Sequence, residues 1–258
     1  MRAVLINLDR STDRLAAFRE QAERIGLPFE RLAATDAAQI HFGRGDLRPG
    51  EVACFESHKR AWQMLVDSGE PWIAVFEDDV CLGSAIVALL GRDDWIPPAT
   101  DLVKLETFQE RVVLAPRASA APGCRLHRLY STHLGAAGYV ISRRWAAELL
   151  RMSDGYREPV DWLLFDLDTD ASPKANILQV VPAPCIQQQW LAARANQAPM
   201  HQTLIEGRET KPPKPQLGRV SKWRREFARI GRQVRRLPVK IRKALTPSRR
   251  MVVPFGDM

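Results

Sequence analysis

Three adjacent carboxylates, Glu77, Asp78 and Asp79, follow the apolar residues 73–76 in the sequence PWIAVFEDDV. Neighbouring negative charges repel one another, so a divalent cation that neutralises them makes such a cluster favourable. Carboxylate oxygens suit Mn²⁺ or Mg²⁺, which usually keep several waters and share the phosphates of a substrate. The triplet therefore predicts a cation site that could hold a nucleotide diphosphate. The alternative is an acidic surface turn that caps the next helix.

Polar side chains that could meet a nucleotide stand at the end of the first apolar run, residues 2–8. Asn7 and Arg10 occupy the place where a nucleotide would lie if this run is a strand. Arg14 follows one helical turn after Arg10 and could reach a phosphate. The alternative for both arginines is a solvated position on a helix surface.

Hydrophobic periodicity predicts alternating strands and helices that would position these residues. A strand at 2–8, a helix that Gly26 can stop and a strand at 29–35 form a βαβ unit, which implies parallel pairing. The remaining predicted elements are helices over 50–69, 82–90 and 143–152 and from Pro159, strands over 72–77, 101–106, 135–142 and 176–188, and a hairpin over 111–131.

The acidic triplet lies at the carboxyl end of the strand predicted over 72–77, and open α/β sheets bind their ligands outside such ends. The sequence contains no Walker A motif and no G-x-G-x-x-G motif, which points away from P-loop enzymes and dehydrogenases. Gly135 could let the backbone approach a sugar closely, although a turn explains it equally well. Gln187, near the end of the last predicted strand, is a further candidate for substrate contact.

Six short motifs follow one another along about the first 190 residues: VLINLDRSTDR, GEVACFESHKRAW, AVFEDDV, VKLE, GAAGYVIS and PVDWLL. In type and order they resemble glycosyltransferase family 25, the lipopolysaccharide and lipooligosaccharide galactosyltransferases. The resemblance implies a GT-A-like α/β fold with a mixed sheet and a UDP-sugar donor, usually UDP-galactose. It also implies Mn²⁺ or Mg²⁺ dependence and inversion to a β-linkage. Ala53 departs from the glycine that usually precedes the cysteine of the second motif.

The resemblance also suggests roles for residues of the motifs. Asp79 would ligate the metal directly, and Asp78 or Glu77 would hold the ribose or a metal-bound water. Ser57 and His58 match the serine–histidine pair of the family and are donor-binding candidates. A lone histidine on a helix, however, is more often a structural group.

An inverting transfer needs a carboxylate that accepts the proton of the acceptor hydroxyl. Asp161 is one candidate, because the N-terminus of a helix favours an ionised carboxylate. Its alternative is a plain capping acid. Glu106, at the end of the strand predicted over 101–106, is the rival, and the sequence does not separate the two.

The cysteines are scattered and form no C-x-x-C pair, which predicts four buried thiols and neither a disulfide framework nor a zinc site. They are Cys54, Cys81, Cys124 and Cys185. No apolar run approaches the roughly 18 to 20 residues that span a bilayer, and charge appears too early at the N-terminus for a signal peptide. We therefore expect a cytosolic protein.

Positive charge is concentrated at the C-terminus. Residues 211–258 hold 15 basic against 2 acidic residues, a net +13, whereas residues 1–210 hold 23 basic against 28 acidic residues, a net −5. We expect a catalytic domain over 1–205, a proline-rich linker over 206–218 and a basic amphipathic helical tail over 219–258.

Three partners are open for the tail: an anionic membrane surface met by residues 219–245, a nucleic acid, and the acidic catalytic domain or a second subunit. We favour the membrane and expect no nucleic acid, because the aromatic side chains of the tail lie on one stripe instead of alternating with basic ones. The sequence thus predicts a glycosyltransferase at the inner face of the cytoplasmic membrane. It would transfer a hexose from a UDP-sugar to a lipid-linked oligosaccharide. The rivals are an inactive glycosyltransferase-like binding module and a nucleic-acid-binding protein.

Overall fold

The computed structural model describes residues 1–41, 45–167, 175–194 and 247–256. In these ranges nine strands form one mixed sheet in the order β11-β6-β7-β9-β5-β8-β3-β1-β2, and β4 pairs with β10 in a separate ribbon. The strands are β1 (Arg2–Asn7), β2 (Glu30–Ala33), β3 (Trp72–Glu77), β4 (Val80–Leu82), β5 (Leu102–Lys104), β6 (Arg111–Ala121), β7 (Cys124–Leu129), β8 (Gly138–Ser142), β9 (Ile177–Val181), β10 (Cys185–Gln187) and β11 (Arg249–Val252). The helices are α1 (Thr12–Ile25), the short 3₁₀ helix η1 (Ala37–Gln39), α2 (Pro49–Ser68), α3 (Ala85–Leu90), α4 (Arg143–Met152), α5 (Val160–Phe165) and α6 (Gln188–Arg194).

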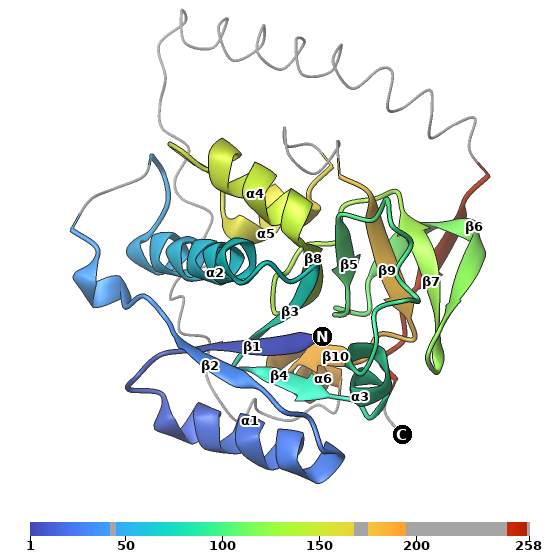
Figure 1. Cartoon of the computed structure of the whole chain (residues 1–258), viewed down its shortest axis with the longest axis horizontal. Helices are drawn as coiled ribbons and strands as arrows, with labels where there is room; N and C mark the ends of the chain where they lie inside the picture. The colour runs from blue at the N-terminus through green and yellow to red at the C-terminus, as the bar shows by residue number, and fades with distance from the viewer. Residues whose placement is uncertain (42–44, 168–174, 195–246, 257–258) are drawn as a thin grey trace, which may run out of the picture.

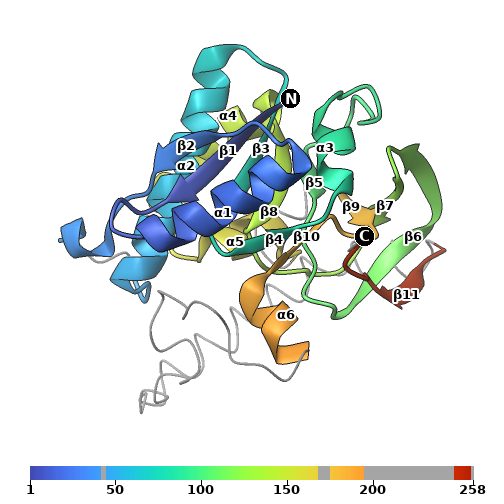
Figure 2. The same cartoon turned by 90° about the horizontal axis from the view of Figure 1, so that it is seen from below.

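Helices cover both faces of the central strands. α2, α4 and α5 lie on one face, and α1 and α3 lie on the other (Figure 1). Figure 2 shows α6 projecting from the body of the molecule where β10 ends. The predicted α/β fold with a mixed sheet is confirmed.

The two-sided cover explains the apolar strand sequences, because alternate side chains of one strand enter different cores. In β1, Val4 and Ile6 join the core beneath α2, α4 and α5. Ala3 and Leu5 face the opposite way and pack with Phe18 of α1. A strand buried on both faces has no polar positions to alternate, so its sequence is a continuous apolar run.

The predicted βαβ unit at the N-terminus is confirmed, since β1 and β2 pair in parallel. α1 ends at Gly26, whose φ of 72° lies in the left-handed region that glycine adopts without strain. α2 starts at Pro49, and the carboxylate of Glu51 accepts a hydrogen bond from the backbone N–H of Arg48 at 3.0 Å. These local signals fix the ends of the two helices that flank the candidate site.

The topology gathers the predicted site residues at one edge of the sheet. β1 and β3 pair in parallel, with Ile6 opposite Glu77, so the carboxyl ends of both strands meet there. β8 runs antiparallel to both β3 and β5. The carboxyl end of β5 therefore reaches the same edge, together with the segment that precedes β8. Side chains far apart in sequence become neighbours there because of strand direction alone.

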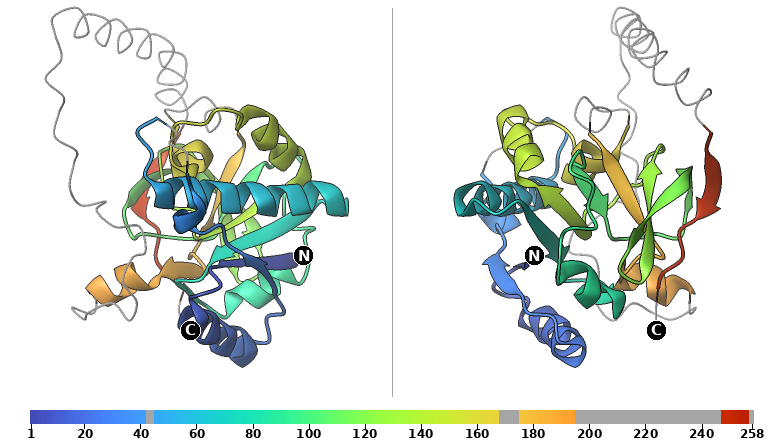
Figure 3. Two further views of the ribbon diagram at one scale, coloured as in Figure 1. Left: turned by 90° about the vertical axis from the view of Figure 1, so that its left-hand side faces the viewer. Right: turned by 45° about the vertical axis from the view of Figure 1, so that its right-hand side comes forward.

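The end of the chain returns to the sheet. β11 pairs antiparallel with β6, and the right-hand view of Figure 3 shows it beside the β6–β7 hairpin. The side chain of Val253 is fully buried, and its carbonyl accepts a hydrogen bond from Thr107 Oγ1 at 2.7 Å. Residues 249–252 are thus a strand, which corrects the expectation of a helical tail at these positions. The linker predicted over 206–218 and the tail over 219–246 lie outside the described residues.

None of the helices in the described ranges could span a bilayer, because none is both long and apolar enough.

Candidate active site

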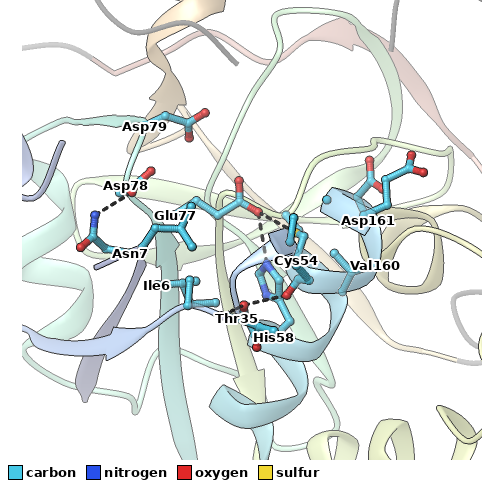
Figure 4. A pocket seen from close by; sticks show the side chains of 18 of the residues that line it. Ile6, Asn7, Thr35, Cys54, His58, Glu77, Asp78, Asp79, Val160 and Asp161 are labelled. Atoms are coloured by element: carbon cyan, nitrogen blue, oxygen red, sulfur yellow. Dashed lines mark hydrogen bonds and ion pairs between the residues drawn. The ribbon is translucent and has the colours of Figure 1, made fainter. Parts of the chain in front are cut away.

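A pocket opens at the edge of the sheet where β1, β3 and β8 come together. Figure 4 shows the carboxylates of Asp79 and Asp161 on opposite sides of it, with Glu77 and Cys54 between them. It encloses about 1170 Å³ of space that is partly open to solvent. Of the residues predicted from the sequence, those that line it are Asn7, Arg10, Arg14, Ser57, His58, Glu77, Asp78, Asp79, Gly135, Asp161 and Gln187.

Asp78 is buried and its charge is already compensated. One carboxylate oxygen accepts a hydrogen bond from Asn7 Nδ2 at 2.7 Å, and the other pairs with Arg14 Nη1 at 3.0 Å. The Asn7 amide also donates to the carbonyl of Ser11 and accepts from Arg31 Nε at 2.9 Å. Asp78 therefore ties β1, α1 and the turn after β3 into one rigid unit.

Asp79 lies where a negative charge is disfavoured. Removal from water, and then the negative charges of Glu77 and Asp78, raise the pKa of Asp79 to about 8, although Arg14 acts in the opposite direction. Its two carboxylate oxygens lie 3.4 and 3.3 Å from Gln187 Nε2. A carboxylate held at this place gains from a neighbouring cation, so the arrangement fits the predicted cation site at Asp79.

Glu77 turns toward α2, away from Asp79 (Figure 4). Its Oε1 lies 3.2 Å from His58 Nε2 and 3.7 Å from Cys54 Sγ. His58 is fully buried, and its Nδ1 lies 2.8 Å from the hydroxyl of Tyr139. His58 thus links the acidic turn to the core beneath it.

Asp161 lies in the first turn of α5, as predicted, and its carboxylate borders the pocket. Oδ1 accepts a hydrogen bond from the backbone N–H of Trp162 at 3.1 Å, and Oδ2 accepts one from Gly135 N at 3.3 Å. Gly135 has a φ of 90°, and a Cβ there would come within 2.1 Å of the ring of Phe108. Only glycine fits where the loop before β8 passes Asp161.

Glu106 is fully buried and does not line the pocket. Its Oε2 accepts hydrogen bonds from Lys104 Nζ and from Ala137 N, both at 3.2 Å. Burial raises the pKa of Glu106 to about 7, although the charge of Lys104 opposes this shift. Lys104 also donates to the carbonyl of Gly135 at 2.7 Å. Glu106 therefore sits behind the loop that carries Gly135, and Asp161 sits in front of it.

Comparison with known proteins identifies the family. Residues 1–164 match glycosyltransferase family 25, described as an LPS biosynthesis protein family. The chain is 31% identical over 223 residues to the lacto-N-neotetraose biosynthesis glycosyltransferase LgtB of Neisseria meningitidis serogroup A, which covers 78% of this chain and 80% of that protein. The chain belongs to glycosyltransferase family 25. The resemblance read from the six motifs is confirmed.

A further curated relative and one solved structure are also similar to this family-25 chain. It is 32% identical over 152 residues to the lipooligosaccharide biosynthesis protein lic2B of Haemophilus influenzae, covering 55% of each protein. Among solved structures, a glycosyltransferase involved in the glycosylation of the major capsid of PBCV-1 aligns with a TM-score of 0.43 and 9% identity. That alignment covers 72% of this chain and 92% of that one.

Two further predicted donor-binding residues of this family-25 chain also have structural partners. Arg10 is exposed and forms an ion pair with Asp36. The hydroxyl of Ser57 is buried, donates to the carbonyl of Ala53 at 2.7 Å and accepts from Thr35 N at 2.9 Å. Ser57 therefore fastens the loop after β2 to α2.

Sequence reasoning missed several residues that shape the site. Arg31 donates a hydrogen bond to the side chain of Asn7. Phe108 and Cys54 line the pocket. Lys104 ends β5 inside the apolar core, and a lysine in the strand motif VKLE is the one signal that could have pointed to a buried partner. The prediction of four buried thiols is wrong for Cys54, which is partly exposed, as are two of the other three cysteines.

Proposed function

We propose that this chain transfers a hexose from a UDP-sugar to a saccharide of lipooligosaccharide or lipopolysaccharide, with inversion at the anomeric carbon. The observation that carries the proposal is the single pocket that joins the acidic turn after β3 to Asp161 on its other side. One side has the residues that a nucleotide diphosphate needs, and the other has a carboxylate that can accept a proton. Galactose is the first candidate for the sugar, and this choice rests on the family resemblance.

Asp79 is the carboxylate that we propose as the ligand of Mn²⁺ or Mg²⁺. A cation bound there would supply positive charge to the departing diphosphate. Asp78 fits a ligand role less well, because both of its oxygens already accept hydrogen bonds from Asn7 and Arg14. We therefore assign Asp78 to positioning, together with Asn7. For Arg10, whose side chain is 53% exposed and pairs with Asp36, we propose contact with a phosphate of the donor.

Asp161 is the general base that we propose. It borders the pocket, whereas Glu106 is sealed behind Gly135 and paired with Lys104. The backbone N–H groups of Gly135 and Trp162 orient the Asp161 carboxylate. An ionised carboxylate held in one orientation can take the proton of an acceptor hydroxyl as the new bond forms.

The names of the relatives, which concern lacto-N-neotetraose and lipooligosaccharide biosynthesis, support a lipid-linked saccharide as the acceptor. An acceptor of this kind lies at a membrane surface. We propose that the protein works on the cytoplasmic face of the inner membrane, held there by the basic residues 219–245. Residues 1–210 are net acidic, so the positive charge that an anionic membrane attracts lies in the C-terminal residues.

The decisive experiment is a calorimetric titration of UDP into the full-length protein, with and without Mn²⁺. The wild type is expected to bind UDP when Mn²⁺ is present, and Asp79→Asn is expected to lose the effect of Mn²⁺. Asp94→Asn is the matched control, because Asp94 is an exposed aspartate outside the pocket. If the wild type does not bind UDP with or without Mn²⁺, the result favours the alternative of an inactive glycosyltransferase-like binding module.

A further inference from the structure

Cys54, His58 and Glu77 form a cluster that the proposed transfer does not use. One ligand atom from each lies within 4.8 Å of the other two. Cys54 and His58 stand four residues apart on α2, so their side chains share one face of the helix. Glu77 ends β3 and points at that face (Figure 4). A thiol, an imidazole and a carboxylate are the three side-chain types that zinc binds.

The distances from Glu77 to the other two ligand atoms match those around a tetrahedral zinc ion. Zinc bonds of about 2.0 to 2.3 Å place a nitrogen and an oxygen ligand about 3.3 Å apart, and a sulfur and an oxygen ligand about 3.6 Å apart. The corresponding distances are 3.2 Å between His58 Nε2 and Glu77 Oε1, and 3.7 Å between Cys54 Sγ and Glu77 Oε1. The side chains need little movement to take a cation between them.

Neighbouring groups already orient the histidine as a metal-binding histidine must be oriented. Its Nδ1 lies 2.8 Å from the hydroxyl of Tyr139, and that hydroxyl also accepts a hydrogen bond from Trp62 Nε1 at 2.9 Å. A hydrogen bond at the far ring nitrogen fixes the ring and leaves Nε2 for the metal. Tyr139 and Trp62 are fully buried, so this support is rigid.

We propose that Cys54, His58 and Glu77 form a site for a thiophilic divalent cation, Zn²⁺ in the first place, in the wall of the pocket. Three protein ligands leave the fourth position to water or substrate. On binding, the Cys54 thiol loses its proton to solvent, and His58 binds through Nε2 as the neutral tautomer whose ring proton is on Nδ1, facing the Tyr139 hydroxyl. The site differs from the one proposed at Asp79, because a thiolate and an imidazole select zinc or cobalt, whereas carboxylates and water select manganese or magnesium.

Cobalt is the probe, because Co²⁺ takes the place of Zn²⁺ and reports a thiolate ligand through an absorption band in the near ultraviolet. Co²⁺ is titrated into full-length reduced protein, and Zn²⁺ is then added. The wild type is expected to show the band at one equivalent, and Zn²⁺ is expected to remove it. Cys54→Ser abolishes the band, and His58→Gln weakens Co²⁺ binding by about tenfold or more.

Two variants serve as controls. Cys81→Ser removes a thiol that is also partly exposed but lies outside the cluster, and it should leave the band unchanged. Asp79→Asn should leave it unchanged as well, so the result does not depend on whether UDP binding needs Asp79. His58 is buried, so circular dichroism first checks that His58→Gln is folded. The proposal is overturned if the reduced wild type shows no band, if the band survives in Cys54→Ser, or if it is lost in Cys81→Ser.

Discussion

Two carboxylates near Gly135 differ in the surroundings that decide their roles. Asp161 borders the pocket and accepts two backbone hydrogen bonds. Glu106 has no exposed surface and is paired with Lys104, which is equally buried. A general base must reach the proton it takes, whereas a buried ion pair mainly holds its surroundings in place. The two residues should therefore respond differently to the loss of charge.

We expect Asp161→Asn to lower kcat by about 10² to 10⁴-fold, the usual contribution of a general base, with little change in the melting temperature. Glu106→Gln should mainly destabilise the fold, because it leaves the buried ammonium of Lys104 without its carboxylate, at a cost of about 3 to 5 kcal/mol. Steady-state kinetics and chemical denaturation of both variants test this pair. A stable Glu106→Gln protein with the larger loss of kcat would make Glu106 the base.

His133 makes stability depend on pH. It is buried with its Nδ1 2.8 Å from Gln179 Oε1, and burial, followed by the charge of Lys104, lowers its pKa from 6.5 to about 3. Between these two values the unfolded chain binds a proton that the folded chain does not. Stability therefore falls as the pH drops below about 6.5, by up to about 1.4 kcal/mol per pH unit from this group.

Replacing His133 by Asn should reduce the slope of unfolding free energy against pH between about pH 6 and pH 4.5, whatever its effect on stability at neutral pH. Urea denaturation across this range measures the slope. The control is His41→Asn, which removes an exposed histidine. An unchanged slope in His133→Asn would contradict the argument.

The residues of the pocket divide into those that sequence could indicate and those it could not. The sequence alone indicates the acidic triplet as a candidate site, because three adjacent charges after a buried strand require an explanation. The pairing of Asp78 with Arg14 spans 64 positions, and that of Asn7 with Asp78 spans 71. Sequence spacing carries no information on such contacts, so the fold was needed to distinguish Asp78, which is paired with Arg14, from Asp79, whose pKa is raised.

At the scale of elements, periodicity predicted the strands and helices that are buried on a regular pattern. β1, α1 and β3 have such patterns, and their ends are marked by Gly26 or by the charges after Phe76. β11 has no such signal. RRMV is half basic, and only its pairing with β6 makes it a strand. The sequence of an edge strand that forms only by pairing with a neighbouring strand can resemble that of a charged tail.

The segment after β11 supports the loop beside the pocket. Val253 is fully buried, and its carbonyl accepts a hydrogen bond from the hydroxyl of Thr107. Thr107 precedes Phe108, which lines the pocket. We expect Val253→Ala to lower the free energy of unfolding by about 1 to 3 kcal/mol, because it removes buried methyl groups and leaves a cavity.

Val252→Ala is the matched control, since Val252 is 43% exposed and its truncation should change stability by less than about 0.5 kcal/mol. Urea denaturation of the two variants measures the difference. Equal stabilities would mean that the C-terminal strand is not docked in solution as it is here.

At the scale of the whole molecule, charge is divided along the chain. Residues 1–210 carry a net −5, and residues 211–258 carry a net +13. β11, which belongs to the catalytic sheet, lies beyond most of the basic residues, so a truncation before residue 219 would remove a strand as well as the charge. The membrane proposal is therefore tested by substitution within the basic segment and not by truncation.

We expect the variant with Arg224, Arg225, Arg235 and Arg236 all changed to Gln to bind anionic vesicles about 10³-fold more weakly than wild type. Each basic residue near an anionic surface contributes roughly 1 kcal/mol, and four together give this factor. Vesicle sedimentation at low and at physiological salt measures the binding, which should weaken as salt screens the charges. Activity on a soluble saccharide acceptor should be retained, because the residues that we assign to the transfer all lie within residues 7–187.

The control is a second variant with four exposed arginines of the catalytic region changed to Gln: Arg19, Arg24, Arg92 and Arg151. It loses the same net charge, so the two variants differ only in where the charge is removed. If both variants lose vesicle binding equally, net charge and not the basic segment holds the protein at the surface. If the wild type binds neutral and anionic vesicles alike, or prefers DNA to anionic vesicles, the electrostatic anchor is contradicted. The basic segment would then have to meet the acidic catalytic region, a second copy of the chain or a nucleic acid.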